Sequence, residues 1–411
     1  MAGLDIGSSK ICCFIAHNDE GAVPRVIGIG QQASRGMKSG AVVDMAAVES
    51  AILHSVHAAE QMAGETIERI IVNLSGGHPA SSSIGVQIAV GGHEVGDADL
   101  RRAFEHGREA TGLNGQAETG RRLIHTIPVG YNIDGSRGIR DPRGMYGQEL
   151  GVDIHIVTAS SGPVQNLTAC IQRCHLEIEG FVVSPYASGL ASLVEDEMEL
   201  GVTVIDMGGG TTTIAVFYEG NVIYTDVVPV GGLHVTNDIA RGLSTGVAQA
   251  ERLKTLYGHA LSGGTDERET IDVPQVGEDE RIQTYQVPRS LLVGIIRPRL
   301  EETFELVRSH LEVSGFDKIA GRRVVLTGGA SQLPGTAELA ALTLDKQIRI
   351  GRPTRIAGLA EATSGPAYAT CAGLLNYAQS VDETAPLRTR AKTGEPDGLM
   401  GRFGHWFREH F

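Results

Sequence analysis

The most informative part of the sequence reads Val204-Ile205-Asp206-Met207-Gly208-Gly209-Gly210-Thr211-Thr212. An apolar strand delivers Asp206 at its end, and small residues follow it. Glycines have no Cβ, so their backbone N–H groups can approach a phosphate closely, and Thr211 and Thr212 add hydroxyl donors. A carboxylate repels phosphate, so we expect Asp206 to hold a Mg²⁺ ion through the water shell of the ion. The motif therefore predicts one half of a phosphate-binding site.

A second motif of the same kind opens the chain. It reads Leu4-Asp5-Ile6-Gly7-Ser8-Ser9-Lys10, again an apolar strand, an aspartate and small residues. Either motif alone is equally compatible with a tight β-turn. Two of them, about 200 residues apart, favour phosphate binding and indicate a duplicated unit. Asp5 is then the second candidate Mg²⁺ anchor.

Two further segments support a nucleotide site. The stretch Val324-Val325-Leu326-Thr327-Gly328-Gly329-Ala330-Ser331 is an apolar strand that enters glycines and then a helix. Its glycines would let a flat base and ribose pack against the backbone. On a predicted helix, Glu251 and Lys254 are three residues apart and share one face. A surface ion pair is the simpler reading of that pair taken alone.

Length and composition limit the classes of protein that are possible. The 411 residues exceed one ordinary core and predict roughly two to four packed units. Apolar residues make up 41% and charged residues 20%, which is typical of a folded, water-soluble body. A net charge of −14 argues against nucleic-acid binding, which needs a basic face. The five cysteines form no C-x-x-C pair and fit a reduced, cytoplasmic setting.

Strands and helices alternate in the first part of the chain. A helix is predicted from a cap at Asp44 to a stop at Gly64. From Ser75 to about residue 152, short strands enclose one helix near 97–110, which indicates an inserted α+β subdomain. The strand 153–158 and the helix 163–174 are expected to return to the first unit. Further helical segments are predicted at 234–257 and 289–313, with a polar hairpin or loop at 262–286 between them.

The last residues differ in composition from the rest of the chain. The apolar residues of the segment recur at helical spacing, and its arginines take the other face; the candidate membrane-contacting residues are Leu399, Met400, Phe403, Trp406, Phe407 and Phe411. This pattern is typical of a helix that lies in a membrane interface. A terminal helix docked on the core of the protein is the alternative. The polar linker that precedes the segment favours the anchor. No stretch approaches the roughly 18 apolar residues of a spanning helix, and no signal peptide is recognised, so membrane contact is expected to be peripheral.

These motifs, in this order, resemble the superfamily of actin, DnaK-type chaperones and sugar kinases. The resemblance implies an α/β fold with two RNase H-like domains around a nucleotide cleft, and it implies ATP with Mg²⁺ as the ligand. Asp5–Lys10 would be the first phosphate loop, Asp206–Thr212 the second and Gly328–Ser331 the adenosine loop. Glu251 and Lys254 match the helix that holds the ribose and base, and 185–191 and 365–375 match the two connecting helices.

Within that superfamily the sequence is most similar to the cell-division family FtsA. The matching elements are Ser34-Arg35-Gly36-Met37 with Gly40, Ile127-Pro128, Gly231-Gly232, Thr236-x-Asp238-Ile239-Ala240 and Arg297-Pro298-Arg299. The resemblance implies domain 1A at 1–76 and 153–190, an inserted SHS2-like subdomain 1C at 77–152, domain 2A at 191–228 and 301–380, and subdomain 2B at 229–300. A flexible linker at 381–398 and a membrane-targeting helix at 399–411 complete this division.

The family resemblance also implies partners and a location. Such a protein ties FtsZ filaments to the cytoplasmic face of the inner membrane at the division septum, polymerises with itself and recruits downstream division proteins. The FtsZ C-terminal tail would dock on subdomain 2B, where Arg299 matches the contacting segment; a solvated helix charge is the equal alternative. Nucleic acid is not expected as a partner.

One departure from the superfamily bears on catalysis. Ser184 stands where actin-like relatives carry the Glu or Gln that positions the attacking water, and serine is a poor base. No catalytic residue is therefore assigned, and at most a slow ATPase is expected. A PilM-type adaptor of pilus assembly and a small-molecule kinase or phosphatase of the same fold are the alternatives. Neither accounts for the terminal amphipathic segment.

Overall fold

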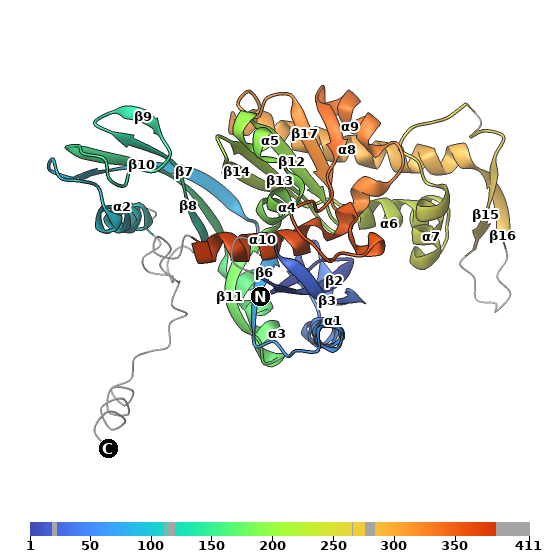
Figure 1. The fold of residues 1–411 in the computed structure, drawn as a ribbon. Helices are drawn as coiled ribbons and strands as arrows, with labels where there is room; N and C mark the ends of the chain where they lie inside the picture. Colours follow the sequence, from blue (N-terminus) through green and yellow to red (C-terminus); the bar gives the residue numbers. More distant parts are fainter. Residues whose placement is uncertain (19–22, 111, 113–119, 265, 276–283, 384–411) are drawn as a thin grey trace, which may run out of the picture.

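Two five-stranded sheets form the centre of the molecule (Figure 1). The computed structural model describes residues 1–18, 23–110, 112, 120–264, 266–275 and 284–383. The first sheet has the order β11-β6-β1-β2-β3 and the second the order β14-β13-β12-β17-β18. The strands of the first are β1 Ala2–Ile6, β2 Lys10–His17, β3 Arg25–Ala33, β6 Arg69–Leu74 and β11 Glu177–Val183. Those of the second are β12 Val202–Met207, β13 Thr212–Tyr218, β14 Asn221–Val228, β17 Arg323–Thr327 and β18 Gln347–Ile350.

The two sheets have the same topology. In the first, β1, β2 and β3 pair antiparallel, and β6 and β11 then add in parallel beside β1. In the second, β12, β13 and β14 pair antiparallel, and β17 and β18 add in parallel beside β12. The duplication expected from the two aspartate motifs is confirmed, and each unit has the expected RNase H-like arrangement.

Helices cover the first sheet. They are α1 Met45–Ala63 and α3 Ser161–Arg173, and the short hairpin β4 Met37–Lys38 with β5 Ala41–Val42 precedes α1. The Asp44 side chain accepts a hydrogen bond from the Ala47 N–H at 3.1 Å and begins α1, while Gly64 ends it at φ +73°. Val48, Ile52 and other apolar residues of α1 are buried against the sheet. The predicted start and end of this helix are confirmed.

The insertion forms its own sheet, with the order β7-β10-β8-β9. It consists of β7 Ala80–Ala89, α2 Asp97–Ala110, β8 Arg121–Ile133, β9 Ser136–Ile139 and β10 Glu149–Ser160. The predicted helix is present, but three of the strands are long, with 10, 13 and 12 residues in β7, β8 and β10, while β9 has four. The expectation that 153–158 returns to the first unit is wrong, because these residues belong to β10 and pair with β7 and β8. A boundary at 152/153 would cut one continuous strand.

The elements beside the second sheet are mostly helical. They are α6 Gly232–Gly242, α7 Val247–Tyr257, the hairpin β15 Thr270–Pro274 with β16 Thr284–Pro288, α8 Arg289–Ser314 and α9 Thr336–Leu344, with short turns η1 Gly329–Gln332 and η2 Glu361–Thr363. The predicted helical segment 234–257 is two helices, because Gly242 and Gly246 flank Ser244 at φ +44°. The predicted hairpin and α8 are confirmed.

Two helices connect the two units: α4 Ser184–Ser192, followed by the short α5 Glu195–Leu200, and α10 Ala369–Glu383, which follows η3 Pro366–Tyr368. In Figure 1, α10 runs between the two sheets. A Cβ at Gly373 would lie 1.7 Å from the Ala187 carbonyl oxygen, so only glycine allows α4 and α10 to cross this closely. This crossing brings the phosphate-loop ends of the two sheets to one place.

The C-terminal predictions lie mostly outside the described residues. Helix α10 continues to Glu383, so residues 381–383 of the predicted linker are helical. The rest of the linker and the segment 399–411 are not among the residues that the structure describes. Within the described part of the chain, no helix is both long and apolar enough to cross a membrane.

Candidate functional site

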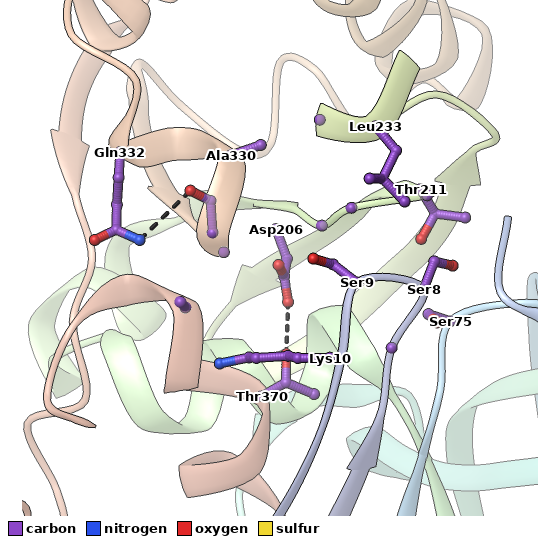
Figure 2. Close-up of a pocket in the computed structure, with 18 of the residues that line it drawn as sticks. Ser8, Ser9, Lys10, Ser75, Asp206, Thr211, Leu233, Ala330, Gln332 and Thr370 are labelled. Atoms are coloured by element: carbon purple, nitrogen blue, oxygen red, sulfur yellow. Dashed lines mark hydrogen bonds between the residues drawn. The ribbon is translucent and has the colours of Figure 1, made fainter. Parts of the chain in front are cut away.

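A cavity of about 450 Å³ lies where the two sheets meet the helices α6, α7 and α8 (Figure 2). Both hairpin turns line it, together with the starts of α6 and η1 and one face of α7. The predicted binding residues that line it are Asp5, Gly7, Ser8, Ser9, Lys10, Asp206, Gly208, Gly209, Gly210, Thr211, Glu251, Lys254, Gly328, Gly329 and Ala330. The fold therefore collects segments from four separate parts of the sequence around one space.

The two hairpin turns approach each other across this cavity. A Cβ at Gly210 would lie 2.4 Å from the Ser8 hydroxyl oxygen, so the close approach requires glycine at that position. The Ser8 hydroxyl accepts a hydrogen bond from the Gly40 N–H at 3.0 Å. The Gly232 N–H donates to the Gly208 carbonyl at 2.9 Å, which joins the second turn to the start of α6. The turns are thus held in place by the backbone around them.

Two predicted residues do not line the cavity. The Thr212 hydroxyl donates to the Val230 carbonyl at 2.8 Å, and the Ser331 hydroxyl donates to the Gly328 carbonyl at 2.7 Å. Successive residues of a strand point to opposite sides, so Thr213 faces the cavity from β13 where Thr212 does not. The buried Thr213 hydroxyl has no hydrogen-bond partner among the described residues, which leaves it available to a ligand or its water. Strand alternation could have revealed Thr213 from the sequence.

The two aspartates are buried side chains at the ends of equivalent strands. The pKa of Asp5 is raised from 3.8 to about 7, mainly by burial; the Lys10 charge opposes the shift and the Asp206 charge adds to it. Burial also raises the pKa of Asp206, although the Thr370 hydroxyl donates to its carboxylate at 2.7 Å. In Figure 2, Asp206 points toward Thr370, and Lys10 extends beneath it. Nothing in the spacing of residues 206 and 370 predicted this contact.

The carboxylates suit a hard cation that a ligand helps to hold. No group of three His, Cys, Asp or Glu among the described residues could hold a metal by itself. Mg²⁺ keeps several waters and is commonly held by one or two carboxylates together with substrate phosphates. A cation would also supply the positive charge that two buried carboxylates need in order to ionise. Asp5 and Asp206 therefore fit a Mg²⁺ ion bound together with a phosphate-containing ligand.

Glu251 and Lys254 form more than a surface ion pair. The Lys254 ammonium donates to the Glu251 carboxylate at 2.7 Å, to the Thr236 hydroxyl at 2.8 Å and to the Gly232 carbonyl at 3.1 Å. The Lys254 side chain is only 16% exposed. The pair thus fastens α7 to α6 and lines the cavity. Apolar side chains complete this wall, including Leu233, Leu300, Leu333 and Pro334, and such a surface suits a flat base.

Ser184 lines the cavity at the start of α4. Its hydroxyl accepts a hydrogen bond from the Asn73 amide at 3.1 Å, and the Asn73 carbonyl oxygen accepts from the Ile6 N–H at 2.6 Å. Sequence reasoning missed Asn73, which is far from Ser184 along the chain. The carboxylates of the described lining are Asp5, Asp206 and Glu251, and the last is held by Lys254 and Thr236.

Arg299 lies on α8 and is held by carboxylates of this chain. Its guanidinium donates to both carboxylate oxygens of Asp238, at 2.6 and 3.3 Å, and also pairs with Glu302. The side chain is 28% exposed. Arg299 does not line the cavity, although its neighbour Leu300 does.

Comparisons with known proteins agree with the fold and the insertion. The family model "Cell division protein FtsA" matches residues 203–373, and "SHS2 domain inserted in FTSA" matches 76–158. The chain is 48% identical to the cell division protein FtsA of Agrobacterium fabrum, covering 99% of this chain and 94% of the relative. It is 31% identical to that of Escherichia coli, covering 100% and 98%. The resemblance inferred from the motifs is confirmed.

Solved structures share the fold at low sequence identity. The PilM–PilN type IV pilus biogenesis complex matches with a TM-score of 0.64 at 18% identity, covering 94% of this chain and 98% of that one. MreB5 of Spiroplasma citri bound to ADP matches with a TM-score of 0.54 at 11% identity, covering 94% and 96%. These likenesses confirm the actin-like architecture.

Proposed function

The chain belongs to the FtsA family of cell division proteins, and we propose that it binds ATP with Mg²⁺ in the central cavity and ties FtsZ filaments to the cytoplasmic membrane. The observation that carries this proposal is the meeting of two equivalent aspartate hairpins around one cavity. Two buried carboxylates, glycine N–H groups and the two lysines Lys10 and Lys254 converge there. This set matches the chemistry of a magnesium nucleotide.

Each part of the cavity receives a role in this proposal. The turns Asp5–Lys10 and Asp206–Thr211 hold the phosphates, and the two aspartates anchor the Mg²⁺ ion. Glu251 and Lys254 contact the ribose and base from α7. The turn Gly328–Ala330 packs against the adenosine, while Thr212 and Ser331 stabilise the loops from outside.

Hydrolysis is expected to be slow. By the superfamily resemblance, Ser184 stands where relatives carry the water-orienting residue, and its hydroxyl accepts a hydrogen bond from the Asn73 amide. The function is therefore structural, with ATP acting as a conformational ligand. Nucleotide that contacts both units stabilises the closed arrangement and, on this proposal, the polymerising form of the protein. The same polymer recruits downstream division proteins to the septum.

Subdomain 2B, residues 229–300, is proposed to receive the FtsZ C-terminal tail at Arg299. Because Asp238 and Glu302 already hold this guanidinium, the tail would have to share it or displace them. Arg299→Ala should weaken tail binding by about tenfold or more, as expected of a central interface residue. Arg297→Ala is the matched control, since Arg297 lies on the same helix and pairs with Glu301. Equal effects of the two variants, measured by fluorescence anisotropy of a labelled tail peptide, would refute the assignment.

The segment 399–411 is proposed as the membrane anchor, and 384–398, the remainder of the predicted linker, is proposed as the linker. The large apolar side chains of the anchor would enter the interface, and its arginines would meet anionic headgroups. One such helix binds weakly, whereas several in a polymer bind firmly through avidity. The protein would then be peripheral, at the cytoplasmic face of the inner membrane.

Co-sedimentation with anionic liposomes and FtsZ, with and without Mg-ATP, tests the whole proposal. FtsZ should reach the pellet only when this protein is present, and more of it should do so with Mg-ATP. Sedimentation of FtsZ that does not depend on this protein would refute the tether. Equal sedimentation with and without nucleotide would refute the role of ATP.

A further inference from the structure

The Lys10 ammonium has an unusual position in the cavity. Its nitrogen lies 3.4 Å from the centroid of the Tyr368 ring. The nitrogen is buried and has no hydrogen-bond partner among the described residues. No ion pair joins it to Asp5 or Asp206 in this part of the chain, although its charge acts on both carboxylates. The aromatic face is thus the direct contact of this cation.

The Tyr368 ring is held independently of Lys10. Its hydroxyl donates to the Gln31 side chain at 2.6 Å, and the ring stacks on Phe14 with centroids 6.1 Å apart and planes 14° apart. Lys10 and Phe14 lie on the same face of β2, four residues apart. Tyr368 therefore packs along β2, the strand that carries Lys10. Gln31 holds its hydroxyl and Phe14 packs on its ring.

The backbone before Tyr368 is bound to the second unit. The Pro366 carbonyl accepts hydrogen bonds from the Gly328 N–H at 3.1 Å and from the Thr327 hydroxyl at 3.2 Å. Gly328 is also part of the proposed adenosine loop. The ring thus belongs to a segment that is bonded to the second unit and whose residues Ala367 and Thr370 line the cavity, while its Lys10 partner comes from the first unit.

We propose that Tyr368 is a positioning residue that keeps the Lys10 ammonium away from Asp5 and Asp206. A lysine beside two buried carboxylates would otherwise pair with them and occupy the charges that Mg²⁺ needs. An aromatic face attracts the cation but takes none of its N–H donors in a strong hydrogen bond. The carboxylates then remain available to the metal, and the N–H donors of the ammonium have no hydrogen-bond partner among the described residues. This role rests on the proposed binding of Mg-ATP.

The test alters the ring face without altering its size. Tyr368 is replaced by Phe and then by phenylalanines carrying one, two and three fluorine atoms, which weaken the negative face stepwise. Isothermal titration calorimetry measures the affinity for Mg-ATP. Tyr368→Phe should bind like the unmodified protein, and the fluorinated series should lose affinity progressively, by about 5- to 30-fold in total. The loss should be smaller for ATP in excess EDTA, because the carboxylates act through the metal.

Two controls separate this role from simple packing. In a Lys10→Ala background, the affinity for Mg-ATP should not change across the fluorinated series, since Tyr368 acts only through the lysine. Gln31→Ala removes the partner of the Tyr hydroxyl and should behave like Tyr368→Phe. A flat series with Lys10 present, a series that gains affinity, or the same loss in both backgrounds would each overturn the inference. Unmodified protein that fails to bind Mg-ATP would overturn the proposed function as well, so the two failures can be told apart.

Discussion

Replacing Asp5 by Asn should stabilise the nucleotide-free protein, and the gain should depend on pH. Burial raises the pKa of Asp5 from 3.8 to about 7. Between these values the unfolded chain has released its proton while the native state still holds it, so native stability falls as the pH rises. Each pKa unit corresponds to about 1.36 kcal/mol. The cost of Asp5 to folding is therefore about 4 kcal/mol at pH 8 and about 1 kcal/mol at pH 4.5.

Asparagine has the same shape as aspartate and cannot ionise, so the variant lacks this cost. Urea unfolding without nucleotide or Mg²⁺ measures the difference, followed by far-UV circular dichroism because the only Trp, Trp406, lies outside the described core. The advantage of Asp5→Asn should be largest at pH 8 and should shrink toward pH 4.5. The control is Asp196→Asn at an exposed position, which should show no such trend. An advantage that is equal at both pH values, or an Asn variant less stable at pH 8, would refute the reasoning.

Three further outcomes are expected. Asp206→Ala should weaken Mg-ATP binding about 10- to 100-fold, as losses of outer-shell metal partners do; unchanged affinity by calorimetry would contradict the two-hairpin site. Steady-state phosphate release should be slower than the roughly 1–100 s⁻¹ typical of kinases, because the superfamily resemblance puts Ser184 where relatives carry the water-orienting residue; a rate inside that range would show that another residue positions the water. Replacing Trp406 and Phe407 by Glu should reduce the sedimentation of monomers with anionic liposomes by orders of magnitude, since each large side chain contributes up to about 1.5–3 kcal/mol on burial. ATP affinity should not change, and a variant that loses ATP binding would place the helix in the core instead.

The Asp5 prediction also shows a conflict between folding and function. Burial of the two carboxylates raises their pKa values and so disfavours their charged forms in the free protein, and a bound cation would offset that cost. Without a bound ligand, the free energy of unfolding should therefore be lower than that of the same fold without buried carboxylates. Such local costs are typical of binding sites. Binding of the magnesium nucleotide should therefore raise the stability of the whole protein.

The local predictions from sequence succeeded where short-range chemistry determines the structure. The α1 boundaries follow from the Asp44 cap and the Gly64 stop, each of which involves residues within one turn. The two aspartate hairpins were found because an apolar strand, a carboxylate and glycines form one contiguous pattern. Their repetition predicted two equivalent sheets, since similar segments fold in similar ways.

The predictions failed where strand partners determine the structure. Residues 153–158 read as a strand, but nothing within them shows that β7 and β8 are their neighbours. The pairing of a strand depends on segments that are distant in the sequence. The boundary of the insertion was therefore placed incorrectly when only the local pattern was considered. For the same reason, the sequence did not indicate that Thr370 bonds to Asp206 or that Asn73 bonds to Ser184.

The chain by itself determined the family, the duplicated α/β units and most of the residues around the cavity. These features depend on the residue types within contiguous motifs. The chemistry of such a motif can be read without knowing which distant segments it contacts. The tertiary structure alone decided that Thr370 bonds to Asp206, that Asp238 holds Arg299, and that Tyr368 covers the Lys10 ammonium. Each of these depends on the direction of a side chain or on a contact between remote segments, and folding of the entire chain is what sets both.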